Sequence, residues 1–139
     1  MKQGQVIDHV SWDDLEMGVT MIADAMEEMF STKRVSVYGI PRGGMIPAIM
    51  LVHLLESRGW TARFAADLNH LMPNELHNII VLDEICDSGD TFKVVKQLFP
   101  MAKTATVFHR EDAGFKPDYH AYVMYDSRWL VFPWEVHNG

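Results

Sequence analysis

Two adjacent carboxylates stand at the end of an apolar run, three residues before a short polar turn. The carboxylates belong to Asp83 and Glu84, and the turn has the sequence DSGDT, from Asp87 to Thr91. A pair of acids can hold hydroxyl groups and a hard cation such as Mg2+. A tight turn at the start of a helix directs backbone N–H groups and the positive end of the helix dipole at one anion. Residues 81–91 therefore predict a phosphate cradle beside a metal-binding acid pair.

The side chains of the turn fit the binding of an anion. Ser88 and Thr91 supply hydroxyl donors, and Gly89 permits a close backbone approach or a positive φ. The alternative is an ordinary N-capped helix that follows a buried strand. That alternative leaves the acids unexplained, because two adjacent carboxylates at the end of a buried strand are costly without partners or a metal.

Alternating strand and helix patterns must position these residues. The strand patterns are short β-rich runs at residues 35–38, 60–66, 78–82, 104–108 and 121–125, and the helix patterns cover residues 12–30, 45–58 and 91–99. The first helix begins after Ser11, a predicted N-cap with Asp14 as its capping-box partner. Alternation of this kind predicts an α/β fold with a mostly parallel central sheet flanked by helices. Ligands then bind at the carboxyl ends of the strands, here the loops at 39–44 and 83–91.

Length and composition exclude several classes of protein. The chain has 139 residues, of which 48% are hydrophobic and 22% charged, so we expect one folded domain over residues 1–139. A net charge of −7 argues against a general nucleic-acid binder. The single cysteine, Cys86, excludes an intramolecular disulfide and is expected to be a packing residue. No secretory signal or membrane-length apolar stretch is seen, which predicts a cytoplasmic protein without a transmembrane segment.

Residues 81–91 resemble the motif by which type I phosphoribosyltransferases bind phosphoribosyl pyrophosphate (PRPP): an apolar strand, two acids, then Asp-Thr/Ser-Gly-x-Thr. The resemblance implies that Asp83 and Glu84 hold the ribose hydroxyls and Mg2+. It implies that the turn from Ser88 through Gly89 and Asp90 to Thr91 binds the 5′-phosphate. Asp87 is then the candidate to accept the proton of the purine ring nitrogen.

Two further segments carry the same resemblance. The sequence IPRGG at 40–44 is similar to the pyrophosphate loop of the family, which implies that Arg42 and Gly43 contact the pyrophosphate; the bond that enters this Arg is often a cis peptide. The sequence RWLVFPW at 128–134 resembles the base-binding end of bacterial xanthine-guanine phosphoribosyltransferases. Trp129 would then stack on a purine and Leu130 would meet its edge.

The chain departs from the family at two points. The Lys that contacts the purine 6-oxo group corresponds here to Arg110, whose fork is longer and less compact. The segment at 67–77 is shorter than the flexible loop that covers PRPP in related enzymes, and it lacks the Ser-Tyr pair of that loop. Its polar donors are Asn69, His70, Asn74 and His77.

The resemblance implies the type I phosphoribosyltransferase fold, with a small C-terminal hood built from the two chain ends. It implies Mg2+-dependent transfer of a phosphoribosyl group from PRPP to a purine base such as guanine, xanthine or hypoxanthine, and a homo-oligomer of two or more copies. A non-catalytic sensor of PRPP or a nucleotide on the same fold is the alternative. The short segment at 67–77 favours the sensor, whereas the intact acid pair and Arg42 favour the enzyme.

Overall fold

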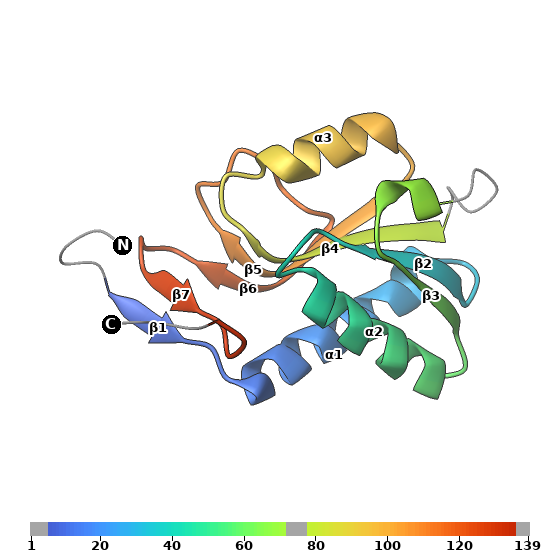
Figure 1. Cartoon of the computed structure of the whole chain (residues 1–139), viewed down its shortest axis with the longest axis horizontal. Coiled ribbons are helices and arrows are strands. Elements are labelled where there is room, and N and C mark those ends of the chain that lie inside the picture. The colour runs from blue at the N-terminus through green and yellow to red at the C-terminus, as the bar shows by residue number, and fades with distance from the viewer. Residues whose placement is uncertain (1–5, 72–77, 136–139) are drawn as a thin grey trace.

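The central feature of the computed structural model is a five-stranded, wholly parallel sheet in the order β3-β2-β4-β5-β6 (Figure 1). Residues 6–71 and 78–135 are described. The strands of this sheet are β2 (Arg34–Gly39), β3 (Thr61–Ala65), β4 (Ile79–Cys86), β5 (Lys103–Arg110) and β6 (Tyr119–Met124). The helices are α1 (Trp12–Met29), α2 (Met45–Ser57), α3 (Asp90–Leu98) and a 3-10 turn, η1 (Leu68–His70). The expected α/β fold with a parallel sheet is confirmed.

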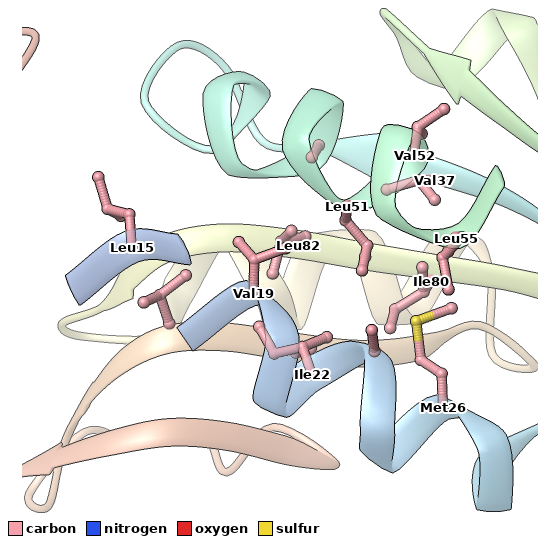
Figure 2. Close-up of a cluster of buried hydrophobic side chains, with 14 of the residues drawn as sticks. Leu15, Val19, Ile22, Met26, Val37, Leu51, Val52, Leu55, Ile80 and Leu82 are labelled. Carbon is pink, nitrogen blue, oxygen red and sulfur yellow. The ribbon is translucent and has the colours of Figure 1, made fainter. Parts of the chain in front are cut away.

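Helices cover both faces of the sheet, α1 and α2 on one side and α3 on the other (Figure 1). The face of α1 that carries Leu15, Val19, Ile22 and Met26 is buried, as its spacing predicts. Figure 2 shows this face of α1 turned toward Leu51 and Leu55 of α2 and toward Ile80 and Leu82 of β4. Burial of each such side chain stabilises the fold by about 1.5–3 kcal/mol relative to exposure.

The first helix begins as its sequence predicts. Asp14 N donates to Ser11 Oγ at 3.0 Å, and Ser11 N donates to Asp14 Oδ2 at 3.0 Å, so the capping box is complete. Two of the amides that a helix start leaves without intrahelical partners are thereby satisfied.

Strand β4 is longer than expected, and this corrects the predicted loop at residues 83–90. Pairs to β5 continue through Asp83 and end at Cys86, so the acid pair lies within the strand. Backbone pairing with β5 outweighs the low strand propensity of the acids. The remaining loop is only residues 87–89.

A second, two-stranded parallel sheet joins the chain ends. Strand β1 (Ile7–His9) pairs with β7 (Trp129–Val131), with Ile7 opposite Trp129. These strands form the expected hood, which lies at the end of the main sheet away from β3 (Figure 1). Within the described residues, no helix is long and apolar enough to cross a membrane.

A buried imidazole lies on the α3 side of the sheet. His109 is 7% exposed, its Nδ1 has no hydrogen-bond partner among the described residues, and its ring stacks on His120 with 5.3 Å between centroids. Burial lowers the pKa of His109, and the nearby His120 and Lys116 lower it further. The fold therefore favours the neutral imidazole.

We expect the free energy of unfolding to fall as the pH drops below about 6.5, because the unfolded state then binds a proton that the folded state resists. His109→Phe keeps an aromatic ring and should flatten this acid-side loss, measured as the melting temperature between pH 8 and pH 5. The exposed His53, changed to Gln, is the control and should keep the wild-type slope. If the melting temperature of His109→Phe falls with pH as steeply as that of the wild type, His109 is not the cause of the acid-side loss.

Candidate functional site

The two loops singled out by the sequence meet where the strand order changes direction. Strands β2 and β4 are neighbours, and the chain leaves β2 for α2 on one face of the sheet but leaves β4 for α3 on the other face. Gly39 at the end of β2 is paired with Leu82 of β4, and Ile40 N donates to Leu82 O at 2.9 Å. Such a switch point opens a crevice at the carboxyl ends of the strands. The loop at 40–44 therefore lies beside the acid pair.

The Arg42 loop makes one tight turn and enters α2. The Pro41–Arg42 peptide bond is cis, as in the resembling family. Gly44 N donates to Ile40 O at 2.9 Å, and Met45 N donates to Arg42 O at 3.1 Å. These bonds leave the Arg42 side chain exposed at the rim of the crevice.

Gly43 brings this loop into contact with Glu84. A Cβ built on Gly43 would lie 1.2 Å from Glu84 Oε2 and 2.3 Å from its Cδ. The Glu84 carboxylate occupies the space that glycine leaves free, so a side chain at position 43 would force this carboxylate to move. The position predicted to contact pyrophosphate and a position predicted to bind metal are therefore in direct contact.

The acid pair is held close in a partly buried setting. Asp83 Oδ1 accepts a hydrogen bond from Glu84 N at 2.8 Å. Burial raises the pKa of Asp83 well above its ordinary value, and the adjacent Glu84 carboxyl raises it further. The pair therefore favours holding a proton between the two carboxyl groups when no cation is bound.

The donor set of this pair fits Mg2+. No group of three His, Cys, Asp or Glu residues that could enclose a metal occurs in the described part of the chain. Mg2+ in phosphate-handling sites commonly takes only one or two carboxylates and completes its shell with water and substrate oxygens. A bound cation would replace the shared proton as the positive charge that the pair requires.

The residues of the predicted cradle lie at the start of α3. Gly89 is the N-cap, with φ of +88°, and the cap has no side-chain hydrogen bond. Asp90 N donates to Ser88 Oγ at 3.3 Å. Ser88, Asp90 and Thr91 are exposed, so their polar groups are accessible to an anion.

A second reason for glycine at 89 emerges from the packing. A Cβ there would lie 2.4 Å from Phe115 Cβ, and Phe115 stacks on the buried ring of Phe92 at 5.3 Å. Bulk at 89 would thus disturb the α3 core as well as the cradle. Cys86 lies in the same core: its Sγ is 3.6 Å from Phe115 O, and burial raises the pKa of its thiol to about 11, which agrees with a packing role.

A pocket of about 780 Å³ joins most of the predicted residues, and we call it the site pocket. It is lined by Arg42, Gly43, Ile46, Glu84, Ile85, Asp87, Arg110, Trp129, Leu130, Phe132, Trp134 and Glu135. A hollow of about 550 Å³ adjoins it and contains Ser88; Asp87, Arg110 and Trp129 line both spaces. Asp83, Gly89, Asp90 and Thr91 line neither.

The site pocket has an aromatic wall supplied by the C-terminal segment. Trp129 is 42% exposed, whereas Leu130 is buried. Phe132 and Trp134 stack with 5.0 Å between centroids, and Trp12 of α1 meets Trp134 at 5.9 Å. Such a wall offers flat surfaces to a planar heterocycle.

Several lining residues were not predicted. Phe132 and Trp134 belong to the RWLVFPW segment and could have been named from their aromatic character. Ile46 and Ile85 are single apolar residues next to predicted positions, with no distinguishing signal. Glu135 accepts a hydrogen bond from Phe132 N at 2.8 Å, a contact that depends on the local turn.

Arg110 lines the pocket, as the resemblance predicts, but its guanidinium already has protein partners. Its Nε is 2.6 Å from Asp87 Oδ1. Its Nη1 donates to Asp126 O at 3.2 Å and its Nη2 donates to Arg128 O at 2.8 Å. The candidate proton acceptor and the candidate base-contacting residue are thus an ion pair.

Of the segment at 67–77, which is shorter than the covering loop of related enzymes, only residues 67–71 are described. Asp67 caps the η1 turn, because its Oδ1 accepts from Asn69 N at 2.9 Å. The predicted donors Asn74 and His77 lie outside the described residues.

Comparison with known proteins agrees with this geometry. The chain is 26% identical over 144 residues to the xanthine-guanine phosphoribosyltransferase of Cereibacter sphaeroides, a match that covers 92% of this chain and 86% of that protein. The purine phosphoribosyltransferase of Pyrococcus horikoshii superposes with a TM-score of 0.78 at 20% identity, covering 96% of each chain. The xanthine-guanine-hypoxanthine phosphoribosyltransferase of Helicobacter pylori gives 0.72 at 20% identity, covering 95% and 94%. No protein-family model matches the chain.

The parallel sheet, the crevice at its switch point and the hood define the fold of the type I phosphoribosyltransferases. Over most of its length the chain is also similar in sequence to xanthine-guanine phosphoribosyltransferases, at 26% identity.

We expect Gly43→Ala to weaken binding of magnesium pyrophosphate at least about tenfold, equivalent to about 1.4 kcal/mol, because its methyl group would displace the Glu84 carboxylate. Isothermal titration calorimetry measures the affinity. Gly59→Ala is the control: Gly59, unlike Gly43, has a positive φ, but nothing lies within 4 Å of its Cβ position, so strain there should leave binding unchanged. Equal affinities for Gly43→Ala and the wild type would show that the contact between Gly43 and Glu84 is not needed to bind magnesium pyrophosphate.

Proposed function

We propose that this protein is a purine phosphoribosyltransferase that transfers the 5-phosphoribosyl group of PRPP to a purine base. One observation carries the proposal: a single pocket joins the Arg42–Gly43 loop and Glu84 to an aromatic wall, with Asp87 between them. In the reaction the bond from ribose C1′ to pyrophosphate breaks, a bond from C1′ to a purine nitrogen forms, and that nitrogen loses its proton. The pocket supports a site for each of the three reacting groups: the ribose, the pyrophosphate and the purine base.

Each end of the pocket fits a different part of this reaction. Arg42 and the amide of Gly43 are placed to bind the departing pyrophosphate through charge-assisted hydrogen bonds. The start of α3, from Ser88 to Thr91, suits the 5′-phosphate because its N-cap, Gly89, has no side-chain hydrogen bond and the hydroxyls of Ser88 and Thr91 are exposed. Catalysis is then mostly electrostatic, since positive charge grows on the ribose while negative charge grows on pyrophosphate.

At the other end, Trp129 supplies an exposed ring for a base and the backbone of Leu130 can meet the base edge. The exposed carboxylate of Asp87 lines the space between base and ribose, where it would accept the proton of the purine nitrogen. The base is of the 6-oxo class, such as guanine, xanthine or hypoxanthine, by analogy with the named relatives.

Asp83 and Glu84 would hold the ribose hydroxyls and one Mg2+. When bound, Mg2+ would neutralise charge on the pyrophosphate oxygens. We further propose that one domain spanning the chain carries the activity, that the protein acts in the cytoplasm in purine salvage, and that it assembles as a homo-oligomer of at least two copies.

Trp129→Ala should weaken binding of guanosine 5′-monophosphate by about 1–3 kcal/mol, the value of one stacked base. The affinity for magnesium pyrophosphate should not change, because that ligand contains no base. The exposed Met101, which does not line the pocket, is the control position when changed to Ala. An equal loss for both ligands in Trp129→Ala would point to a general disturbance of the hood instead of a base stack.

The decisive experiment for the function follows pyrophosphate release from PRPP and Mg2+ with each of guanine, xanthine, hypoxanthine, adenine and uracil. We expect turnover with at least one 6-oxo purine, and loss of that turnover in Glu84→Gln. A rate near 10 per second or above would show that a long covering loop is dispensable here. Tight nucleotide binding without pyrophosphate release for any base would instead support the non-catalytic sensor.

A further inference from the structure

Arg110 is tied to both sides of the site pocket. It is the last residue of β5, and its side chain is 12% exposed. The partner of its Nε, Asp87, follows β4, whereas the partners of its Nη atoms are carbonyls of Asp126 and Arg128 in the turn before β7. One guanidinium therefore connects the candidate proton acceptor to the segment that carries Trp129.

The carbonyls that Arg110 contacts belong to a turn that is itself braced. Arg128 donates from Nε to Asp126 Oδ1 and from Nη2 to Asp126 Oδ2, each at 2.9 Å. Its Nη1 donates to Asp8 Oδ2 of β1 at 3.0 Å. The turn is thus fixed to the hood, and Arg110 holds Asp87 against a framework instead of a free loop.

The geometry of these contacts requires arginine. The guanidinium carries five N–H donors in a planar fork, and here its three nitrogens each reach a different acceptor. A lysine has one compact ammonium on a flexible stem and could not bridge the three. The lysine of the resembling family could not perform this task.

Resting on the proposed function, we propose that Arg110 is a positioning residue that holds Asp87 and the Trp129 segment at the separation a purine requires, and that it does not select the 6-oxo group of the base. Asp87 is 64% exposed on its side chain, so without this contact it would sample several rotamers. The Arg110 contact places its carboxylate on the base side of the ribose site.

Two substitutions distinguish a positioning role, in which Arg110 acts as a clamp on Asp87, from a direct contact of Arg110 with the 6-oxo group of the base. Arg110→Lys retains a donor for a carbonyl but loses the three-way contact, and Arg110→Ala loses both. If Arg110 is a clamp, both variants lose kcat about tenfold or more. Arg110→Lys retains kcat if Arg110 reads the carbonyl, and that result overturns the proposal.

A second readout does not depend on turnover. The ratio of affinities for guanosine and adenosine 5′-monophosphates should stay within about twofold of wild type in Arg110→Ala and Arg110→Lys. A fall in affinity confined to guanosine 5′-monophosphate would show that Arg110 reads the 6-oxo group, which overturns the proposal. Circular dichroism and melting temperature verify that each variant is folded.

A double-mutant cycle tests whether Arg110 acts through Asp87. Asp87→Asn combined with Arg110→Ala should be no slower than Asp87→Asn alone, because the clamp has nothing left to hold. If the fold-losses of kcat in the two single variants multiply in the double variant, the positioning role is overturned but the proposed function is not. Absence of turnover in the wild type overturns the proposed function, and the role of Asp87 as proton acceptor with it.

The chain offers a matched control pair far from the pocket. Arg58 contacts Asp24 at 2.8 Å, and Asp24 is 64% exposed, the same fraction as Asp87. Arg58→Ala should leave kcat and both nucleotide affinities unchanged. Arg58→Ala measures the effect of losing an ordinary surface ion pair, which is worth about 0–1 kcal/mol in stability. A larger loss of kcat in the Arg110 variants would then be due to the position of the Arg110–Asp87 pair at the pocket.

Discussion

The pairing of β2 with β4 is the constraint on which the site depends. Because Gly39 lies opposite Leu82, the loop after β2 and the acids of β4 must occupy the same edge of the sheet. The contact between them is so close that a side chain at position 43 would displace the Glu84 carboxylate. A change of register by one residue would turn every side chain of the strand to the other face and separate the two groups.

The same arrangement places charge where the protein alone cannot balance it. Two carboxyl groups lie together, partly buried, and the pKa of Asp83 is raised in consequence. The need for a proton or a cation is therefore built into the strand, and it suits a site that receives an anionic substrate together with a metal.

The hood supplies what the sheet lacks, a flat apolar surface for a base. Its two strands come from opposite ends of the chain and are joined through backbone pairing and through the Arg128–Asp8 ion pair. The aromatic wall then rests on Trp12 at the start of α1. The base end of the pocket thus depends on contacts between residues more than 100 positions apart, whereas each of the two phosphate loops, at 40–44 and 88–91, is a run of consecutive residues.

This difference between local and long-range contacts explains which features of the fold and of the pocket could be predicted from the sequence alone. Local patterns predicted the capped first helix, its buried apolar face, the parallel sheet and the phosphate turn, because each depends on neighbouring residues or on the period of a single element. They also predicted most of the pocket, through three motifs that follow one another in the chain. The sequence likewise indicated Gly89 as a position of positive φ.

Only the tertiary structure decided the extent of β4 and the partners of Arg110. Pairing with β5 carried the strand through Asp83 and Glu84, although acids have a low propensity for strands. The guanidinium of Arg110 reaches residues 16 and 18 positions ahead and Asp87 behind it, which no local pattern encodes. Such contacts depend on the separation of three strands in space, a quantity that is set by packing and not by spacing along the chain.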